Sequence, residues 1–300
     1  MIESVIGFLK MNDVEYVEDE PLKHLSTIGI GGKAKIIAYP NNLTCFIKTI
    51  DFIVDNKIKY KILGRMSNVL PRDEDYVGII IKTDRLSKFS VSDRSLIAHT
   101  GATIPNLSLI TSRCGLSGME ELSGIPGSLG GAITGNAGAF NREISDLIVS
   151  VDCYDISSKS IMRFQNAQCN FSYRSSLFKD NNFVVLSAVL DLSDSSVNSA
   201  MAKMFEYRQK RLKNQPVGVK SIGSTFKRTK DGTSAAYYID KCGLKGLSFG
   251  DAQISEKHAG FIINNGHALS TDYLGLVAII KQKVKENFNV ALTEEIEILN

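Results

Sequence analysis

Hydrophobic positions in the first third of the chain follow helical and strand periods in turn. Residues 1–10 show a helical period, and a second helix is expected after Asn41 or Asn42, either of which could cap it. The apolar face of that second helix consists of Leu43, Phe46, Ile47, Ile50, Ile53 and Val54. Strands are expected at Tyr60–Leu63 and Val77–Lys82, and the latter contains three successive isoleucines, which favours a buried strand. This order of elements predicts an α/β subdomain.

Short strand patterns dominate the middle third of the chain. The clearest are Leu96–Ala98, Leu147–Tyr154 and Phe183–Leu192, and a helix is expected near Ile104–Cys114. Residues 193–200 are rich in Asp, Ser and Asn, which indicates a domain boundary. A second subdomain, built mainly from strands, is therefore expected before that boundary.

The last hundred residues contain two further helical patterns. One covers Ala200–Lys213, and the other begins at Ser270 or Thr271, either of which could cap it. The apolar face of this last helix consists of Tyr273, Val277, Ile280, Val284 and Phe288. The sequence therefore predicts a third domain of the α+β class.

Composition narrows the class of protein. The 300 residues are 43% apolar, enough for a sizeable core, and 35 Lys and Arg nearly balance 32 Asp and Glu. Nucleic-acid binding is not expected, because even the densest basic stretch, Arg208 to Lys213, fits the solvated face of a helix. The start has no signal-peptide pattern and no 18-residue apolar run occurs, so we expect a cytoplasmic protein without membrane insertion.

Metal and disulfide chemistry are not expected either. The five cysteines are odd in number and scattered, and no pair has the Cys-x-x-Cys spacing. We expect reduced thiols, most of them buried, at Cys45, Cys114, Cys153, Cys169 and Cys242. The four histidines are too dispersed to predict a metal site.

The most informative stretch is residues 118–140, which holds seven glycines and one proline. Glycine allows positive φ, lets the backbone approach a ligand closely and can aim several N–H groups at one point. A surface linker would be dominated by Gly and Ser, whereas this stretch interleaves Ile125, Leu129 and Ile133 with its glycines. It predicts a buried cradle for the pyrophosphate of a nucleotide cofactor.

A second glycine motif, Gly29 to Ala34, fits the G-x-G-x-x-A dinucleotide fingerprint. The fingerprint needs a strand before it and a helix after it. Here no apolar strand precedes the motif, and residues 36–40 are strand-like and end at a proline. We therefore expect a turn near a ligand and not a Rossmann unit.

Seven segments between residues 24 and 296 carry a resemblance to a known family. They are Ser26–Ala34, Leu63–Gly64 with Ser67–Leu70, Gly118–Phe140, Phe171–Ser176, Gly223–Arg228, Cys242–Gly246 and Val290–Glu295. In this order they resemble UDP-N-acetylenolpyruvoylglucosamine reductase, also called UDP-N-acetylmuramate dehydrogenase. The chain looks like the shorter type, which lacks an inserted tyrosine-bearing loop, and residues 255–261 also resemble that type.

The resemblance implies an α+β fold with a two-subdomain FAD-binding part of the vanillyl-alcohol-oxidase type and a C-terminal substrate-binding domain. The implied parts are residues 1–78 and 79–196 for FAD and residues 197–300 for substrate. It further implies non-covalent FAD, NADPH as reductant, and the enolpyruvyl ether of UDP-N-acetylglucosamine as substrate. The product would be UDP-N-acetylmuramate, a precursor of peptidoglycan, and we expect the enzyme to be a monomer.

The resemblance also implies which residues contact the ligands. The expected cofactor contacts are Gly64, Arg65, Met66, Ser67, Asn68, Val69, Gly101, Gly124, Pro126, Gly127, Ser128, Gly130, Gly131, Asn136, Gly138 and Ala139. The expected substrate contacts are Tyr173, Lys220, Lys227 and Arg228, of which the basic ones would reach the diphosphate.

Three residues match the chemistry of the implied reaction. Hydride added to the β-carbon of the enol ether leaves negative charge on the adjacent carbon and its carboxylate, which needs an electrophile and a proton donor. Arg174 is the candidate electrophile, since a guanidinium can bind a carboxylate through two parallel hydrogen bonds. Ser224 is the candidate acid, because a carbanion is basic enough to deprotonate a hydroxyl. Glu295 would assist Arg174 in a protonated or proton-sharing form; from the residues alone, Glu294 is equally eligible, and the family pattern favours Glu295.

One departure leaves alternatives open. The flavin loop of the family is usually Gly-Gly-Gly-Ser-Asn, whereas here Arg65 and Met66 replace two glycines, at a cost of about 1 kcal/mol each if positive φ persists. Arg65 could offset this by pairing with a cofactor phosphate. The alternatives are a related flavin oxidase with another substrate, or a cofactor-free protein that binds a UDP-sugar or a cell-wall synthesis partner.

Overall fold

The computed structural model describes residues 2–179 and 182–300, and their contacts divide the chain into two compact units. The first unit comprises residues 1–17, 36–64 and 78–210. The second comprises residues 18–35, 65–77 and 211–300. Each unit is therefore assembled from three separate stretches of sequence.

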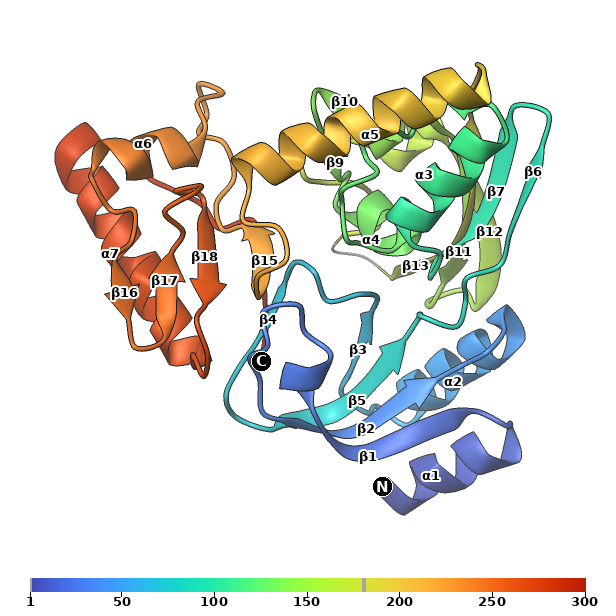
Figure 1. Ribbon diagram of the computed structural model, residues 1–300. Helices are drawn as coiled ribbons and strands as arrows, with labels where there is room; N and C mark the ends of the chain where they lie inside the picture. The colour runs from blue at the N-terminus through green and yellow to red at the C-terminus, as the bar shows by residue number, and fades with distance from the viewer. Residues whose placement is uncertain (1, 180–181) are drawn as a thin grey trace. The chain divides into compact units, whose positions relative to one another are not determined.

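A four-stranded sheet with two helices has most of its residues in the first unit (Figure 1). Its strands, in spatial order, are β1 (Glu15–Pro21), β2 (Lys33–Tyr39), β5 (Tyr76–Lys82) and β3 (Tyr60–Leu63). The helices α1 (Ile2–Met11) and α2 (Leu43–Asp55) bury Leu9 and Phe46 in the same hydrophobic cluster as Ile36 and Ile81 of the sheet. β3 and β5 are parallel neighbours, so both end at the same edge of the sheet.

A five-stranded antiparallel sheet forms the other part of the first unit. Its strands, in spatial order, are β12 (Ser160–Gln165), β11 (Ile148–Asp155), β13 (Phe183–Asp191), β7 (Ser95–His99) and β6 (Phe89–Ser92). The helices α3 (Ile104–Arg113) and α4 (Leu129–Thr134) supply Leu107 and Leu129 to a core that also holds Ala98 and Leu190. The glycine-rich stretch is therefore packed, because α4 lies within it.

Two short ribbons complete the first unit. β8 (Leu116–Ser117) pairs with β14 (Ser193–Asp194), and β9 (Gly138–Ala139) pairs with β10 (Arg142–Glu143). The 3-10 helices η2 (Ile144–Asp146) and η3 (Asn166–Cys169) lie between β10 and β14 in the chain, and the long helix α5 (Val197–Asn214) follows β14.

The second unit is an antiparallel sheet with two helices. The strands, in spatial order, are β15 (Ser221–Ser224), β18 (Phe261–Asn264), β17 (Ala252–Ile254) and β16 (Ser248–Phe249). α7 (Ser270–Phe288) packs against β16 and β17, and α6 (Ala235–Lys241) packs against α7. Two shorter elements, η1 (Leu22–His24) and the parallel pair of β4 (Val69–Pro71) and β19 (Glu297–Leu299), belong to the same unit.

Most of the predicted elements are confirmed, and two local predictions are wrong. Asn42 caps α2, with its Oδ1 accepting from the Cys45 amide at 2.9 Å. α7, however, is not capped by Ser270 or Thr271, which lie inside its first turn. Their amides instead donate to the carboxylate of Asp73, at 2.7 and 3.2 Å, so the cap comes from a residue about 200 positions earlier.

The expectation that most cysteines are buried is also wrong. Cys153 and Cys169 are buried, Cys45 and Cys242 are half-buried, and Cys114 is exposed, although all five are free thiols as expected. Gly29 to Ala34 does not form a Rossmann unit, as expected, while its place near a ligand stays a prediction. The stretch follows η1 and runs into strand β2, so it lacks the strand-then-helix arrangement of a dinucleotide fingerprint.

Candidate active site

Three segments expected to contact the cofactor meet within the first unit. A Cβ on Gly64 would clash with the hydroxyl of Ser128, and one on Gly101 would clash with the carbonyl of Thr83. A Cβ on Gly130, inside α4, would likewise clash with the hydroxyl of Thr100. The glycines at these positions allow the three segments to approach one another, which larger residues would prevent.

The glycine-rich stretch retains main-chain donors for a phosphate. The amides of Leu129 and Gly130 donate to protein carbonyls, both at 2.8 Å, and so are not available. Across residues 2–179 and 182–300, no acceptor lies within hydrogen-bonding range of the amides of Gly124, Gly127 and Ser128. These three N–H groups fit the pyrophosphate of a dinucleotide, which binds through amide donors. Pro126 is exposed between them, and Gly131 donates to the Ser128 hydroxyl at 3.4 Å.

Asn136 is the buried centre of a polar network in the same unit. Its side-chain nitrogen donates to Glu143 Oε2 at 2.8 Å and to the carbonyl of Ser172 at 3.0 Å. Gly138 and Ala139 form β9 directly after it, and a Cβ on Gly138 would clash with β10. These three predicted cofactor contacts are therefore fixed by one hydrogen-bonded ribbon.

The loop that departs from the family pattern keeps one of its two strained positions. Met66 has a φ of +52° and a side chain that is 3% exposed, whereas Arg65 is exposed and does not adopt positive φ. The steric cost therefore falls on Met66 alone, about 1–2 kcal/mol. Ser67 and Asn68 follow, and Val69 begins β4; residues 65–69 belong to the second unit.

Arg174 occupies a strained position in the first unit. Its φ is +55°, and its guanidinium lies over the ring of Tyr173, 4.9 Å from the ring centroid. The guanidinium nitrogens donate to the carbonyls of Asn136 and Gly138 at 3.4 and 3.3 Å, and one lies 3.8 Å from Glu143 Oε1. These three contacts are long for hydrogen bonds and ion pairs.

Ser224 and Glu295 lie beside each other in the second unit. Ser224 ends β15, and the carbonyl of the next residue, Thr225, accepts the Glu295 amide at 2.9 Å. The Thr225 hydroxyl is buried and hydrogen-bonded to the hydroxyl of Tyr273 at 2.9 Å. This arrangement fixes the two candidates on adjacent stretches of backbone, while Arg174 belongs to the other unit.

The ambiguity between the two neighbouring glutamates is reduced by their surroundings. The carboxylate of Glu294 forms an ion pair with Lys281, whose ammonium lies 2.9 Å away. The main chain of Glu294 pairs with that of Phe226 in an isolated antiparallel β-bridge. The main-chain carbonyl of Glu295 accepts from the Asn68 side chain at 3.0 Å. Glu295 is thus the glutamate tied to the predicted cofactor loop.

The predicted substrate contacts are spread over both units. Tyr173 is 42% exposed in the first unit; Lys227 and Arg228 follow Ser224 in the second, where Arg228 donates to the Gly232 carbonyl at 3.0 Å. Lys220, at the other end of β15, lines a hollow of about 480 Å³. Its walls also include Lys23, His24, Asp73 and His267, together with the turn at residues 29–31.

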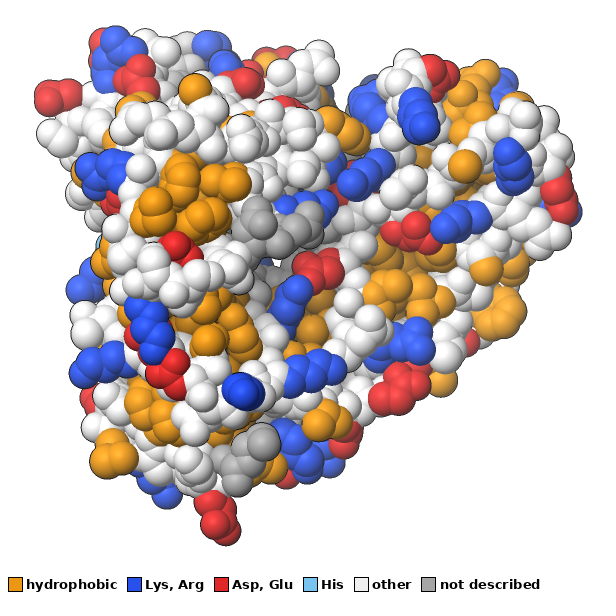
Figure 2. All heavy atoms as spheres, turned by 180° about the vertical axis from the view of Figure 1, so that it is seen from behind, with side chains coloured by type: hydrophobic (Ala, Val, Ile, Leu, Met, Phe, Trp, Pro, Cys, Tyr) orange, Lys and Arg blue, Asp and Glu red, His pale blue; other side chains and the backbone are white. Residues whose placement is uncertain are grey.

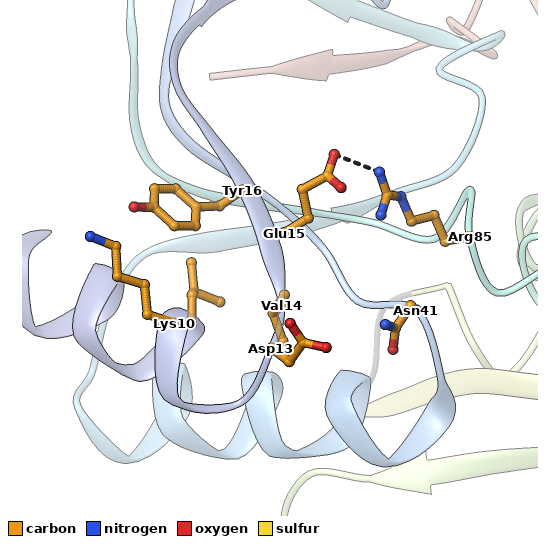
Figure 3. A pocket seen from close by; sticks show the side chains of 8 residues that line it. Lys10, Asp13, Val14, Glu15, Tyr16, Asn41 and Arg85 are labelled. Atoms are coloured by element: carbon orange, nitrogen blue, oxygen red, sulfur yellow. Dashed lines mark ion pairs between the residues drawn. The ribbon is translucent and has the colours of Figure 1, made fainter.

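A second hollow, of about 650 Å³, lies in the first unit at the turn from α1 into β1 (Figure 3). Glu15 and Arg85 form an ion pair of 2.5 Å at its rim, and Lys10, Asp13 and Tyr16 also line it. None of the predicted site residues lines this hollow.

Sequence reasoning missed two charged residues next to the predicted cofactor loop. Lys82, at the end of β5, is 2% exposed, donates to the carbonyl of Gly64 and lies 3.1 Å from Asp84. The signal was a lysine that closes an otherwise apolar strand, a position where an unpaired charge would be costly.

The surface charge and the potential metal ligands can be described for part of the molecule. Basic and acidic side chains are interspersed over the face shown in Figure 2, without a continuous basic stripe. Within the described ranges, no group of three or more His, Cys, Asp or Glu could hold a metal ion. The helices of the described part are all too short or too polar to cross a bilayer.

Comparison with known proteins identifies both parts of the chain. Residues 34–163 match the family described as FAD binding domain, and residues 215–299 match the C-terminal domain of UDP-N-acetylenolpyruvoylglucosamine reductase. A reductase of that name from Pseudothermotoga lettingae is 39% identical, over 93% of this chain and 96% of its own length. One from Caldanaerobacter subterraneus is 38% identical over 100% and 99%.

Solved structures agree. The crystal structure of the Thermus caldophilus reductase matches with a TM-score of 0.80 and 31% identity, covering 96% of this chain and 99% of that one. A berberine bridge enzyme variant, titled a reticuline dehydrogenase, matches with a TM-score of 0.52 and 15% identity, over 64% of this chain and 44% of that one. The latter likeness shows only a shared fold.

The fold and the cradle define a flavoprotein oxidoreductase with FAD as its cofactor. The predicted α+β architecture, an FAD-binding part followed by a separate C-terminal domain, is confirmed. The chain belongs to the UDP-N-acetylenolpyruvoylglucosamine reductase family.

Proposed function

We propose that this chain reduces the enolpyruvyl ether of UDP-N-acetylglucosamine to UDP-N-acetylmuramate, with NADPH as reductant and FAD bound non-covalently. The observation that carries the proposal is the hydrogen bond between Thr225 and Glu295, which sets Ser224 beside Glu295. Both lie inside the stretch that matches the C-terminal domain of the family. The product is a precursor of peptidoglycan.

The three candidate catalytic residues have separate tasks. Bound FAD supplies the hydride that reaches the β-carbon of the enol ether. Arg174 binds the substrate carboxylate, where its positive charge stabilises the charge that develops on the α-carbon. Ser224 donates its hydroxyl proton to that carbon, and Glu295 assists at the carboxylate in a protonated or proton-sharing form.

The cofactor contacts divide by chemistry. The amides of Gly124, Gly127 and Ser128 bind the pyrophosphate, because they have no acceptor in the described part of the protein. The exposed side chain of Arg65 is available to pair with a cofactor phosphate. At the remaining proposed contacts, from Gly64 to Ala139, the main chain comes close to the cofactor and positions it.

The division by ligand remains as expected from the sequence. Residues 1–78 and 79–196 bind FAD, and residues 197–300 bind the UDP-sugar. Lys220, Lys227 and Arg228 bind the diphosphate, with Tyr173 also contacting substrate. The enzyme acts as a cytoplasmic monomer, and size-exclusion chromatography with light scattering tests its oligomeric state.

An anaerobic visible spectrum tests the whole proposal. NADPH should bleach the yellow purified protein, and the enolpyruvyl substrate should then restore the colour without air. Recolouring only in air would favour an oxidase that acts on another substrate. Failure to take up FAD would instead favour the cofactor-free binding protein.

A further inference from the structure

The strongest unassigned feature is a buried lysine in the first unit. Lys82 is 2% exposed, its ammonium lies 3.1 Å from Asp84 Oδ2, and it donates a hydrogen bond to the main-chain carbonyl of Gly64. Removing an ammonium from water is costly unless partners satisfy it. If Lys82 served only to fill space, an apolar residue could replace it without loss of stability. The groups that its ammonium contacts therefore indicate what the lysine does.

Those partners lie where ligands bind in sheets of this kind. Lys82 is paired with Leu63 at the end of the parallel strands β3 and β5, and the Thr83 amide continues the pairing by donating to the Leu63 carbonyl at 3.0 Å. Ligands of parallel sheets bind outside the carboxyl ends of the strands. Gly64 also lies against the Ser128 hydroxyl here, so the lysine contacts the point where two of the proposed cofactor segments meet.

The contact with Gly64 fixes a whole peptide group. A peptide is planar and trans, so the carbonyl of Gly64 and the amide of Arg65 point in opposite directions. Lys82 holds the carbonyl on the protein side. The Arg65 amide, on the other side of the same plane, finds no acceptor in the part of the chain that the structure describes.

Asp84 adds a second observation at the same point. Its Oδ2 faces the ammonium of Lys82, while its Oδ1 is buried and has no hydrogen-bond partner among residues 2–179 and 182–300. Buried carboxylate oxygens are nearly always hydrogen-bonded, so an unsatisfied one indicates a donor that the protein itself does not supply. An unsatisfied acceptor therefore lies beside the contact between Lys82 and Gly64.

We propose that Lys82 is a positioning residue for the cofactor: its ammonium, held by Asp84, fixes the Gly64–Arg65 peptide so that the Arg65 amide donates to bound FAD. The inference rests on the proposed role of Gly64 and Arg65 as cofactor contacts. Lys82 acts through the peptide and does not itself touch FAD.

Titration of the apoprotein with FAD, followed by flavin fluorescence, tests the inference. Lys82→Met keeps the unbranched stem of the side chain, one atom shorter, and removes its charge; we expect the Kd for FAD to rise about 10- to 100-fold, as for loss of a charge-assisted hydrogen bond. Lys82→Arg, which retains a cationic donor, should recover part of the affinity. Lys48→Met, at an exposed position on α2, is the matched control and should bind FAD like the wild type.

The outcomes separate positioning from a structural role. A lower unfolding midpoint of apo Lys82→Met together with an unchanged Kd would overturn the inference, because packing alone would then explain the lysine. If Lys82→Met does not fold, the NMR signal of the Arg65 amide in the wild-type protein tests the inference instead. FAD should shift its proton resonance downfield and slow its exchange with solvent; no change in either would also overturn the inference.

The same titration distinguishes this inference from the proposed function. A wild-type protein that fails to bind FAD contradicts the proposed function and the inference together. A wild-type protein that binds FAD, with Lys82→Met binding equally well, contradicts only the inference.

Discussion

Asn68 donates a hydrogen bond from its side-chain nitrogen to the main-chain carbonyl of Glu295, at 3.0 Å and across 227 positions of sequence. The Glu297 amide returns a bond of 2.9 Å to the carbonyl of Asn68, where β4 and β19 begin to pair. One bond therefore ties the proposed catalytic glutamate directly to the proposed flavin loop, and the second ties Glu297, two residues further on, to the same asparagine. Both residues belong to the second unit.

The first prediction concerns this link. In Asn68→Ala the main-chain bond from Glu297 remains, so we expect a loss of only about 1 kcal/mol in the free energy of unfolding. Substrate reduction should slow about tenfold, because Glu295 would be held less firmly and the activation barrier would rise by a comparable free energy. Urea unfolding and stopped-flow absorbance measure the two effects. Asn265→Ala, at an exposed asparagine of the same unit, should leave the rate unchanged; equal rates for both variants would contradict the link.

The second prediction concerns the proton donor. Ser224→Ala should slow reoxidation of the flavin by substrate about 10²- to 10⁴-fold, the usual contribution of a general acid. Reduction of the flavin by NADPH should proceed at the wild-type rate, because that step needs no proton from Ser224. Ser221→Ala, at the opposite end of β15, is the control. Equal slowing of both half-reactions would show that Ser224 is not the acid.

The third prediction distinguishes the two glutamates. Glu295→Ala should slow substrate reduction about 10²-fold or more, whereas Glu295→Gln, which has the shape of a protonated carboxyl, should retain more activity. Glu294→Ala breaks the half-exposed pair with Lys281 and should cost less than about 1 kcal/mol of stability, with little effect on rate. A larger kinetic loss in Glu294→Ala than in Glu295→Ala would reverse the assignment.

The fourth prediction sets strain against burial at Met66. Met66→Gly relieves about 1–2 kcal/mol of left-handed strain. It also removes a fully buried side chain, a change that costs about 2–5 kcal/mol in protein cores, and adds backbone freedom to the unfolded chain. Burial should therefore win, and urea unfolding of the apoprotein should show a loss of about 1 kcal/mol or more. A more stable variant would mean that the loop is held under more strain than its φ indicates.

The fifth prediction concerns pH. Burial lowers the pKa of His258 below its usual value of 6.5, with the charge of Lys245 acting in the same direction and that of Asp240 opposing it. Its Nδ1 also accepts the Gly260 amide at 3.1 Å, which a protonated ring cannot do. The unfolded chain therefore binds the proton more readily, so this contribution to stability is present above about pH 6.5 and is lost as the pH falls toward the lower folded pKa.

Urea midpoints measured between pH 7.5 and about pH 5 test the sign of this effect. The wild type should lose stability over this range, and His258→Gln should lose less. His267→Gln, at an exposed histidine of the same unit, should follow the wild type. Parallel curves for wild type and His258→Gln would contradict the prediction.

The parts of the fold that follow from local pattern were predictable. α2 and its Asn42 cap depend on residues within a few positions of each other, and the strand Tyr60–Leu63 has the expected bounds. The density of glycines indicated a stretch where the backbone closely approaches its surroundings, as the structure has at Gly130 and Gly138; the phosphate cradle itself stays a prediction.

What could not be predicted depends on residues far apart in sequence. The cap of α7 comes from Asp73, which periodicity within the helix cannot reveal. Lys82 resembled any lysine at a strand end until its burial beside Gly64 was known. The surroundings of Arg174 likewise depend on Glu143 and on a left-handed backbone that sequence does not encode for an arginine.

The division into units built from separate stretches has a consequence for biosynthesis. The core of the second unit holds Ile28, Ile30 and Leu70 together with residues beyond 220, and β4 finds its partner only in β19 at residues 297–299. The ribosome therefore delivers residues 18–35 and 65–77 long before most of the surface that they cover exists. Their apolar side chains remain uncovered while more than two hundred further residues are synthesised, and the nascent chain must avoid aggregation during that time. A fragment that stops short of β19 would leave β4 unpaired.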